Sequence, residues 1–415
     1  MDDVRLVRPD RDQHLLTPTH LDGLLPADHE ARMIWAATGG LDLSGFYQTI
    51  QSRESTAGRS AIDPRLLLAL WLFATTQGVG SGRELERLCQ QHDAYRWLCG
   101  GIKISYHTLN DFRVSRGQML DDLLTQLLTV LVHHNVVNVK RISQDGTRVR
   151  ASAGKSSFRR RHRLESLQAE MKAHVASLKK HLDDAPTSPK RTLRAAERRL
   201  TQVEQALETL EGLESAKAKQ KNKPSKKRLP RASTSDPEAR IMRMPGGGYR
   251  PAYNVQFATD TESRAIVGVD VTNSGSDANE SQPLRGQVEA RTKRTVNEHL
   301  MDGGYVNLKA IEDAERNGVR IYAPVPEPKK EGLDPHAPRK GDGPGVIAWR
   351  QRMASDAAKK IYKQRAATVE TVNADAKAHR GMHQFPVRGK TKTRCIALLF
   401  ALTYNLIHFG SYLAT

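Results

Sequence analysis

The ten residues Arg141–Arg150, which read RISQDGTRVR, determine how the chain is best interpreted. They form a β-rich run with one acid, Asp145, next to Gly146, and valine and isoleucine residues flank this pair. A carboxylate on a strand beside a glycine can approach a phosphate or a metal ion closely. A lone acid is most often an ordinary solvated side chain, so a site would need further acids from elsewhere in the chain.

Two later stretches carry acids in suitable contexts. His299–Tyr305 (HLMDGGY) is expected to form a short strand that ends at Asp302, and the two glycines after it leave space for a phosphate. A predicted helix then contains four polar residues at fixed spacing: Tyr362, Arg365, Glu370 and Lys377. Asp145 and Asp302 would lie side by side if their strands are neighbours, and a helix packed on the sheet would bring Glu370 to the same point.

Along that helix, seven residues separate Glu370 from Lys377, so the two side chains share a face, with Asn373 between them. Lys377 then lies about 10 Å along the axis, a suitable distance for contact with an adjacent phosphate. Arg365 is expected to lie well around the helix from Glu370. It would pair with a phosphate at the rim of the site, or with a surface acid such as Asp356.

Composition and charge narrow the class of protein. At 415 residues the chain is long enough for two or three domains. A formal net charge of +19 implies a polyanionic partner, with nucleic acid as the first candidate and a membrane surface as the weaker one. Residues 1–16 lack the apolar core of a signal peptide, and we expect no apolar run of transmembrane length, because Cys395–Leu406 is short and contains polar residues. The three cysteines fit neither a zinc site nor a disulfide framework, which favours a reducing, intracellular setting.

Residues 1–135 are predicted to be helical. Asp63 followed by Pro64 is typical of a helix start, and residues 81–84 (SGRE) form a capping box that opens the next helix. A third helix ends in Arg113 and Arg116, so the segment is compatible with a DNA-binding helix-turn-helix unit and equally with a plain helical bundle. Leucines at helical spacing then predict a long amphipathic helix that docks this N-terminal domain on the core: Leu120, Leu123, Leu124, Leu127, Leu128 and Leu131.

Residues 155–235 differ abruptly in composition. Two apolar seams, from Leu164 to Leu182 and from Leu193 to Leu210, predict an antiparallel coiled-coil hairpin that acts as a spacer or dimer arm, or contacts DNA directly. The run Lys217–Arg231 has eight basic residues and no acid, so we expect a tether that is disordered when alone and contacts the phosphate backbone. Its predicted DNA contacts are Lys226, Lys227, Arg228 and Arg231.

From residue 236 onward, predicted strands and helices alternate. Tyr253–Ala258 and Ala265–Thr272 are expected to be strands joined by a hairpin turn, and Ser276–Arg291 a helix. The strand that ends at Asp302, a helix, a further strand and two helices complete the order, with a loop at Pro324–Gly345. With the insertion left out, this order predicts an α/β fold whose mixed sheet has helices on both faces.

In these features the chain resembles bacterial insertion-sequence transposases of the DDE type, in the branch with a helical N-terminal domain and a coiled-coil insertion after the first acid. The residues that carry the resemblance are 143–147 (SQDGT), 253–256 (YNVQ), 266–268, 271–273, 302–305 (DGGY) and the string Tyr362, Arg365, Glu370 and Lys377. The resemblance is loose over residues 1–135 and closest over 141–409. The step from Arg365 to Glu370 is one residue longer than in some related branches, and a core position explains Tyr362 equally well.

The resemblance implies a ribonuclease-H-like catalytic core with an all-α N-terminal domain and a helical-hairpin insertion. The implied segments are a DNA-binding or dimerisation domain at 1–135, the first part of the core at 136–154, the insertion and basic tether at 155–235, and the rest of the core at 236–415. It also implies that Asp145, Asp302 and Glu370 are catalytic residues that bind two divalent cations, Mg²⁺ with Mn²⁺ as a substitute.

The implied activity is excision and integration of an insertion sequence, by strand cleavage and then attack of the freed 3′ hydroxyl on target DNA. The implied partner is double-stranded DNA with terminal inverted repeats, bound by a homodimer in the bacterial cytoplasm at the nucleoid, without a membrane. Phosphate contacts are expected from Arg365 and Lys377 and from Arg380, Arg388 and Lys390, which would otherwise form a solvated face. The rival interpretations are a catalytically silent DNA-binding protein and a ribonuclease-H-fold nuclease without strand transfer.

Overall fold

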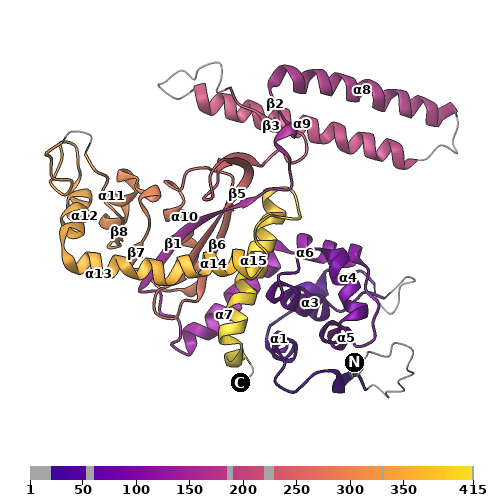
Figure 1. The fold of residues 1–415 in the computed structure, drawn as a ribbon, viewed down its shortest axis with the longest axis horizontal. Coiled ribbons are helices and arrows are strands. Elements are labelled where there is room, and N and C mark those ends of the chain that lie inside the picture. The colour runs from indigo at the N-terminus through magenta and orange to yellow at the C-terminus, as the bar shows by residue number, and fades with distance from the viewer. Residues whose placement is uncertain (1–19, 53–59, 185–189, 219–228, 329–330, 414–415) are drawn as a thin grey trace, which may run out of the picture.

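The computed structural model describes residues 20–52, 60–184, 190–218, 229–328 and 331–413. Helices form the N-terminal region, a sheet with flanking helices occupies the middle of the molecule, and a pair of long helices projects from it (Figure 1). The expected α/β class, with a mixed sheet and a helical N-terminal region, is confirmed.

The sheet is mixed, with its longest strands in the centre. The strand order is β4-β5-β1-β7-β8, and β6 also pairs with β5. The strands are β1 (Arg141–Arg150), β4 (Arg240–Arg243), β5 (Tyr249–Asp260), β6 (Ile266–Thr272), β7 (Glu298–Leu300) and β8 (Arg320–Tyr322). β5 runs antiparallel to β1, β4 and β6, whereas β7 is parallel to both β1 and β8.

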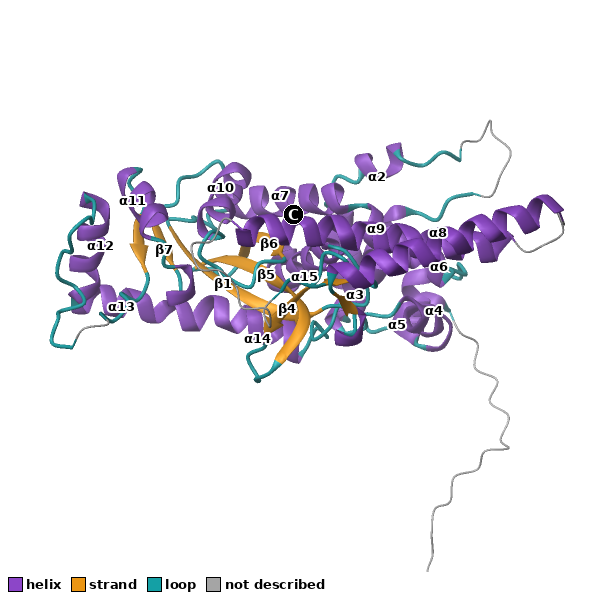
Figure 2. Cartoon of the chain, turned by 90° about the horizontal axis from the view of Figure 1, so that it is seen from above, coloured by secondary structure: helices purple, strands orange, loops and turns teal. Residues whose placement is uncertain are grey.

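Helices cover both faces of the central strand β5, whose residues are all buried from Pro251 to Asp260. One face carries α10 (Ser281–Thr292). The other carries α14 (Thr371–Ala378) and α15 (Lys390–Phe409), where the rings of Phe257 and Phe400 lie 5.3 Å apart. Figure 2 shows α10 on one side of the sheet, and α14 with its neighbour α13 (Asp356–Arg365) on the other.

The rest of this half consists of α11 (Leu308–Arg316), the short turn η4 (Gly303–Tyr305) and α12 (Pro344–Ala354). Helix α12 was not predicted from the sequence, and it begins where a loop was expected to end. Its Trp349 is fully buried, and the indole N–H donates to the Ala323 carbonyl at 3.1 Å. A proline at the first helical position starts this helix, as is common.

The N-terminal region is helical, as predicted. Its elements are η1 (Leu21–Leu24), α1 (Glu30–Gly39), α2 (Ser44–Gln48), α3 (Pro64–Thr76), α4 (Gly82–Gln91), α5 (Asp93–Cys99), α6 (Tyr106–Ser115) and α7 (Gly117–His133). The two predicted caps are confirmed, because Asp63 accepts from the Arg65 N–H at the start of α3 and Ser81 accepts from the Glu84 N–H at the start of α4. All six predicted leucines of α7 are buried.

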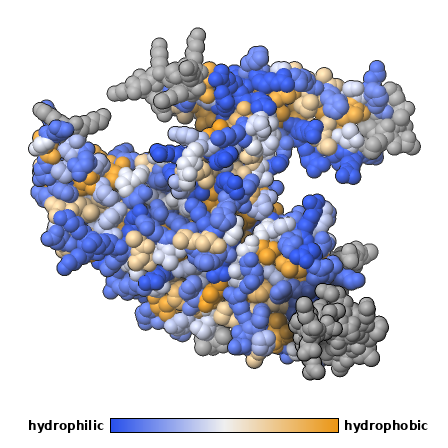
Figure 3. Space-filling model, in the orientation of Figure 1, coloured by the Kyte–Doolittle hydropathy of each residue, from blue (hydrophilic) through white to orange (hydrophobic). Residues whose placement is uncertain are grey.

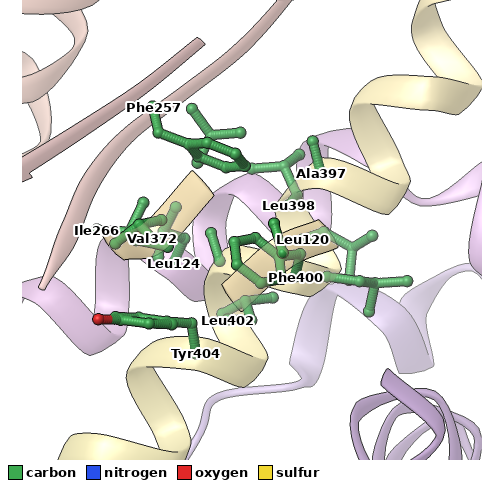
Figure 4. Packing of buried hydrophobic residues seen from close by; sticks show 14 of the residues in the cluster. Leu120, Leu124, Phe257, Ile266, Val372, Ala397, Leu398, Phe400, Leu402 and Tyr404 are labelled. Atoms are coloured by element: carbon green, nitrogen blue, oxygen red, sulfur yellow. The ribbon is translucent and has the colours of Figure 1, made fainter. Parts of the chain in front are cut away.

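Helix α15 joins the N-terminal region to the sheet. It packs against α7, α3 and α6 on one side and against β6 on the other. Figure 4 shows Leu120 and Leu124 of α7 in the same cluster as Phe257 of β5 and Leu398 and Phe400 of α15. One continuous hydrophobic core therefore extends from the first helices to the sheet, which confirms that α7 docks the N-terminal helices on the core.

The same helix bears on the question of a membrane. By length and composition alone, the span Lys390–Leu413, which includes the turn η6 (Gly410–Leu413), is apolar enough to cross a bilayer. The expectation that no segment reaches transmembrane length is therefore wrong. Since 61% of the apolar window is buried inside the structure, α15 also has the features of a core helix in a soluble protein, and one such helix is weak evidence for a membrane.

Helices α8 (Arg161–Asp184) and α9 (Lys190–Ala218) form the projecting arm. Short elements at its base are η2 (Lys155–Ser157) and the paired strands β2 (Phe158–Arg159) and β3 (Ala232–Ser233). Apolar side chains hold the arm together near that base: Leu164, Val203, Ala206, Leu210 and Ala232. Residues 185–189, between the two helices of the arm, and most of the basic tether, with Lys226, Lys227 and Arg228, lie outside the described residues.

A buried asparagine gives a test of the packing between α15 and the sheet. The Asn405 amide pairs with the backbone of Ile266 in β6, accepting from its N–H at 2.9 Å and donating to its carbonyl at 2.9 Å. Asn405→Leu leaves both buried backbone groups without partners, so we expect it to lower the free energy of unfolding by roughly 2–5 kcal/mol in urea titrations.

Thr403→Val is the matched control on the same helix. The Thr403 hydroxyl is buried and has no hydrogen-bond partner among the described residues. Its removal should leave stability unchanged or raise it. Equal losses in the two variants would contradict the role assigned to Asn405.

Candidate active site

Two of the three predicted acids lie at the same level of neighbouring strands. β1 and β7 run parallel, with Ser143 opposite Leu300, so Asp145 and Asp302 each lie two residues beyond a matched pair. Asp302 follows the end of β7 and caps η4, where its Oδ1 accepts from the Gly304 N–H at 2.8 Å. The condition under which Asp145 and Asp302 lie side by side, that their strands are neighbours, is thus met.

Asp145 is largely buried, with 18% of its side chain exposed. Its Oδ1 accepts from the Gly146 N–H at 2.9 Å, and its Oδ2 accepts from the Asn373 side-chain amide of α14 at 2.9 Å. Burial is the main cause that raises the pKa of Asp145 to about 6, with the charge of Asp302 adding to the rise and that of Arg365 opposing it. Asp145 is therefore a carboxyl group whose negative charge is poorly compensated.

The Arg365 side chain lies between Glu370 and Asp145 and links them. The Arg365 guanidinium lies 3.1 Å from Glu370 Oε1 and 3.8 Å from Asp145 Oδ2, and only 11% of this side chain is exposed. The prediction that Arg365 lies well around the helix from Glu370 is therefore wrong. Half of the Glu370 side chain is exposed.

A π-helical turn explains this arrangement. Between α13 and α14 the chain forms the π-helix η5 (Ala366–Glu370) in place of a regular α-turn. In an α-helix, a step of five residues would place Glu370 about 140° around the axis from Arg365. Because a π-helix bonds residues five apart, it brings Arg365 and Glu370 to the same side. The additional residue between them is accommodated at this turn.

The helical face that was predicted to carry Glu370, Asn373 and Lys377 is turned toward Asp145. Asn373 donates to Asp145, and Lys377 is close enough for the two charges to interact. Burial lowers the pKa of Lys377, with the Asp145 charge acting against this and the charge of Arg148 adding to it. Glu370, Asn373 and Lys377 thus line one side of the site.

Gly146 has a different role from the one predicted. A Cβ atom at this position would lie 2.5 Å from Gln256 Nε2, 2.6 Å from Asp277 Oδ1 and 2.8 Å from Asn254 Oδ1. The glycine therefore leaves space for a polar cluster on the face of β1 opposite the Asp145 side chain, and not for a phosphate. Asp277 was not among the residues predicted from the sequence. The signal was the YNVQ stretch, in which Asn254 and Gln256 point to the same face of a buried strand.

The residues predicted to contact DNA differ in whether they are bonded within the protein or exposed to solvent. Arg380 is an internal contact, because it donates to Asp375 at 3.1 Å and to the Thr76 carbonyl at 2.6 Å. Arg231 and Lys390 are exposed. Arg388 is also exposed, and with Lys392 it lines two clefts, one against α9 and one against α6. Figure 3 shows the molecule hollowed between the arm and the N-terminal helices.

The donor atoms at the site suit a hard divalent cation. Asp145, Asp302 and Glu370 offer carboxylate oxygens, and the buried Asn373 Oδ1 has no hydrogen-bond partner among the described residues. Within the described part of the chain, no three His, Cys, Asp or Glu residues already converge on one metal-sized point. Arg365 provides the positive charge between Asp145 and Glu370 in this arrangement.

The pKa of Asp145 gives a stability prediction. Its folded pKa of about 6 exceeds the ordinary 3.8, so between these values the folded protein binds more protons than the unfolded chain and loses stability as the pH rises. Asp145→Asn should therefore raise the free energy of unfolding at pH 7.5 in EDTA by on the order of 2 kcal/mol, and by much less at pH 4. Urea unfolding at the two pH values measures the difference.

Asp313→Asn, at a half-exposed acid on α11, is the control and should behave as the wild type at both pH values. If Asp145→Asn is no more stable than wild type at pH 7.5, the burial cost assigned to Asp145 is wrong.

Family models of known proteins match a segment near each end of the chain. A family model described as a transposase DDE domain matches residues 346–409, which include Arg365, Glu370 and Lys377. A second model, described as a transposase domain (DUF772), matches residues 19–115. No curated protein and no solved structure matches the chain. The two family models indicate an insertion-sequence DDE transposase.

Proposed function

We propose that this DNA transposase cuts and joins DNA strands at Asp145, Asp302 and Glu370, in a core of the ribonuclease-H-like type. The observation that carries the proposal is the placement of Asp145 and Asp302 at one level of adjacent parallel strands, with Glu370 linked to Asp145 through Arg365. The order β6-β5-β1-β7-β8, with three antiparallel strands followed by two parallel ones, supports this type of core.

Asp145 and Asp302 would hold divalent cations, and Glu370 would complete the site from the helix. Two such ions activate the attacking oxygen and neutralise the charge on the leaving oxygen, which is the chemistry needed at a DNA phosphate. Mg²⁺ is the proposed ion, with Mn²⁺ as a substitute, because all the donors are hard oxygen atoms. Asn373 keeps Asp145 oriented by its hydrogen bond, and Arg365 has to leave the space between Asp145 and Glu370.

The proposed reaction has two phosphoryl-transfer steps. Water attacks a phosphodiester at the element's end, so that one P–O bond forms, another breaks, and the 3′ oxygen leaves as a hydroxyl. This 3′ hydroxyl then attacks a phosphodiester of the target DNA and displaces a second 3′ oxygen. Lys377, close to Asp145, is the proposed contact for an adjacent phosphate.

DNA would bind across several parts of the chain. The molecule is hollowed between the arm and the N-terminal helices, and Arg388 and Lys392 line clefts against α9 of the arm and α6 of the N-terminal region, which supports a path for a duplex there. Arg231 and Lys390 offer further exposed positive charge. We propose that residues 1–135 bind DNA, that residues 136–154 and 236–415 together form the catalytic core, and that residues 155–235 form the insertion. Recognition of terminal inverted repeats by a homodimer, in the bacterial cytoplasm at the nucleoid, belongs to the same proposal.

The test uses a duplex that carries the end of the element encoding this chain, in Mg²⁺ or Mn²⁺. Wild type should release a 3′ hydroxyl and join it to target DNA. Asp302→Asn should bind the duplex equally well, but its cleavage rate should fall by a factor of roughly 1,000 or more. Gel electrophoresis separates cleaved from joined products, and a mobility shift measures binding.

Asp313→Asn serves again as the control for a surface acid. Binding without cleavage by the wild type would make the chain a silent DNA-binding protein. Cleavage of any duplex without joining would make it a nuclease.

A further inference from the structure

The loop between β6 and α10 carries an acid that the catalytic scheme above does not use. Asp277 is close to fully buried, with 12% of its side chain exposed. Its Oδ1 accepts from the Asn254 amide at 2.5 Å and from the Gln256 amide at 2.7 Å, and its Oδ2 lies 3.6 Å from the Arg148 guanidinium. Asp277 therefore binds side chains from both central strands, β1 and β5.

Asp277 is linked to the turn that carries Asp302. The Gln256 amide that donates to Asp277 also accepts, at its Oε1, from the Tyr305 hydroxyl and from the Gln144 amide. Tyr305 is fully buried and ends the DGGY turn, whose first residue is Asp302. Because all of its polar atoms are engaged, the Gln256 amide has one orientation, which fixes the position of the Tyr305 hydroxyl.

Asp277 also lies close to Gly146, next to Asp145, and to Gly304, two residues after Asp302. A Cβ atom at Gly304 would lie 3.0 Å from Asp302 Oδ1 and 3.6 Å from Asp277 Oδ2. A Cβ atom at Gly146, next to Asp145, would lie 2.6 Å from Asp277 Oδ1. One carboxylate thus packs against the backbone adjacent to each of the two acids.

We propose that Asp277 is a positioning residue, which holds the Asp302 turn at a fixed place relative to Asp145 through the amides of Asn254 and Gln256. This inference rests on the proposed function, because it concerns the geometry of the acids assigned to catalysis. Without Asp277, two buried amides lose their common acceptor, the Gln256 side chain is free to turn, and Tyr305 no longer has a fixed partner. A shift of the Asp302 carboxylate by about 1 Å is enough to cost on the order of 100-fold in rate.

The experiment compares Asp277→Ala, Asp277→Asn and the surface control Asp313→Ala in the full-length protein. Cleavage of the element's end should be on the order of 100-fold slower in Asp277→Ala. Asp277→Asn keeps an oxygen that accepts from both amides, so it should lose only about tenfold. Without DNA, Mn²⁺ binding followed by electron paramagnetic resonance of the free ion should weaken in the same order, while Asp313→Ala stays at the wild-type level.

A double-mutant cycle separates positioning from general damage. Tyr305→Phe removes only the hydroxyl that bonds Gln256, and if it acts through the same network, its effect in an Asp277→Asn background should be much smaller than in wild type. Additive effects, or cleavage and Mn²⁺ binding by Asp277→Ala at the level of Asp313→Ala, would overturn the proposal. If Asp277→Ala does not fold, the Asp277→Asn and Tyr305→Phe cycle still decides the question.

Asp145→Ala distinguishes the two proposals. If it loses cleavage while the Asp277 variants remain normal, only the positioning role fails. If Asp145→Ala itself cleaves normally, the proposed function fails as well.

Discussion

The contact of Arg365 with two acids is the interaction on which the site depends. Carboxylates near one another in a partly buried space repel, and burial adds to the cost of their charges. Asp145 shows this cost in its raised pKa, and the Arg365 guanidinium between Asp145 and Glu370 offsets part of it. A regular helix would not place a cation there, so the π-turn at 366–370 makes the arrangement possible. Such turns are frequent at functional sites because they change the direction of a few side chains without ending the helix.

The helix that carries Glu370 is also fixed to the N-terminal region. Arg380, just beyond α14, donates to the Thr76 carbonyl at the end of α3, and a Cβ atom at Gly381 would lie 2.7 Å from the Gly78 carbonyl oxygen. The two chain segments approach this closely because glycines stand on both sides of the contact, each with positive φ. Together with the core around α15, this contact holds the N-terminal helices in a defined place relative to the acids. DNA bound by those helices would therefore be positioned with respect to the site.

The sequence was sufficient for features that depend on local pattern. Caps at Asp63 and Ser81 and the leucine face of α7 follow from side-chain periodicity and turn chemistry, whereas the pairing of the strands that carry Asp145 and Asp302 does not. Arg365 was misplaced because the prediction assumed 3.6 residues per turn, and one additional residue in a helix leaves no mark that periodicity detects. The internal partners of Arg380 were missed for another reason. A count of basic residues shows positive charge but not the carbonyl and carboxylate groups that the fold brings beside it.

Asp277 shows why a site can be larger than its motif. Alternate residues of a strand point to opposite faces, so Asp145 faces α14 while Gly146 faces Asp277 in the loop before α10. The sequence motif contains the acids, which lie on the face of the sheet toward α14, and no catalytic or DNA-binding residue was predicted on the opposite face. On the second face, Asn254, Gln256 and Tyr305 are buried polar groups, and such groups are stable only with their partners in place. Since these partners come from two strands, a loop and the DGGY turn, the second face restrains the relative positions of Asp145 and Asp302.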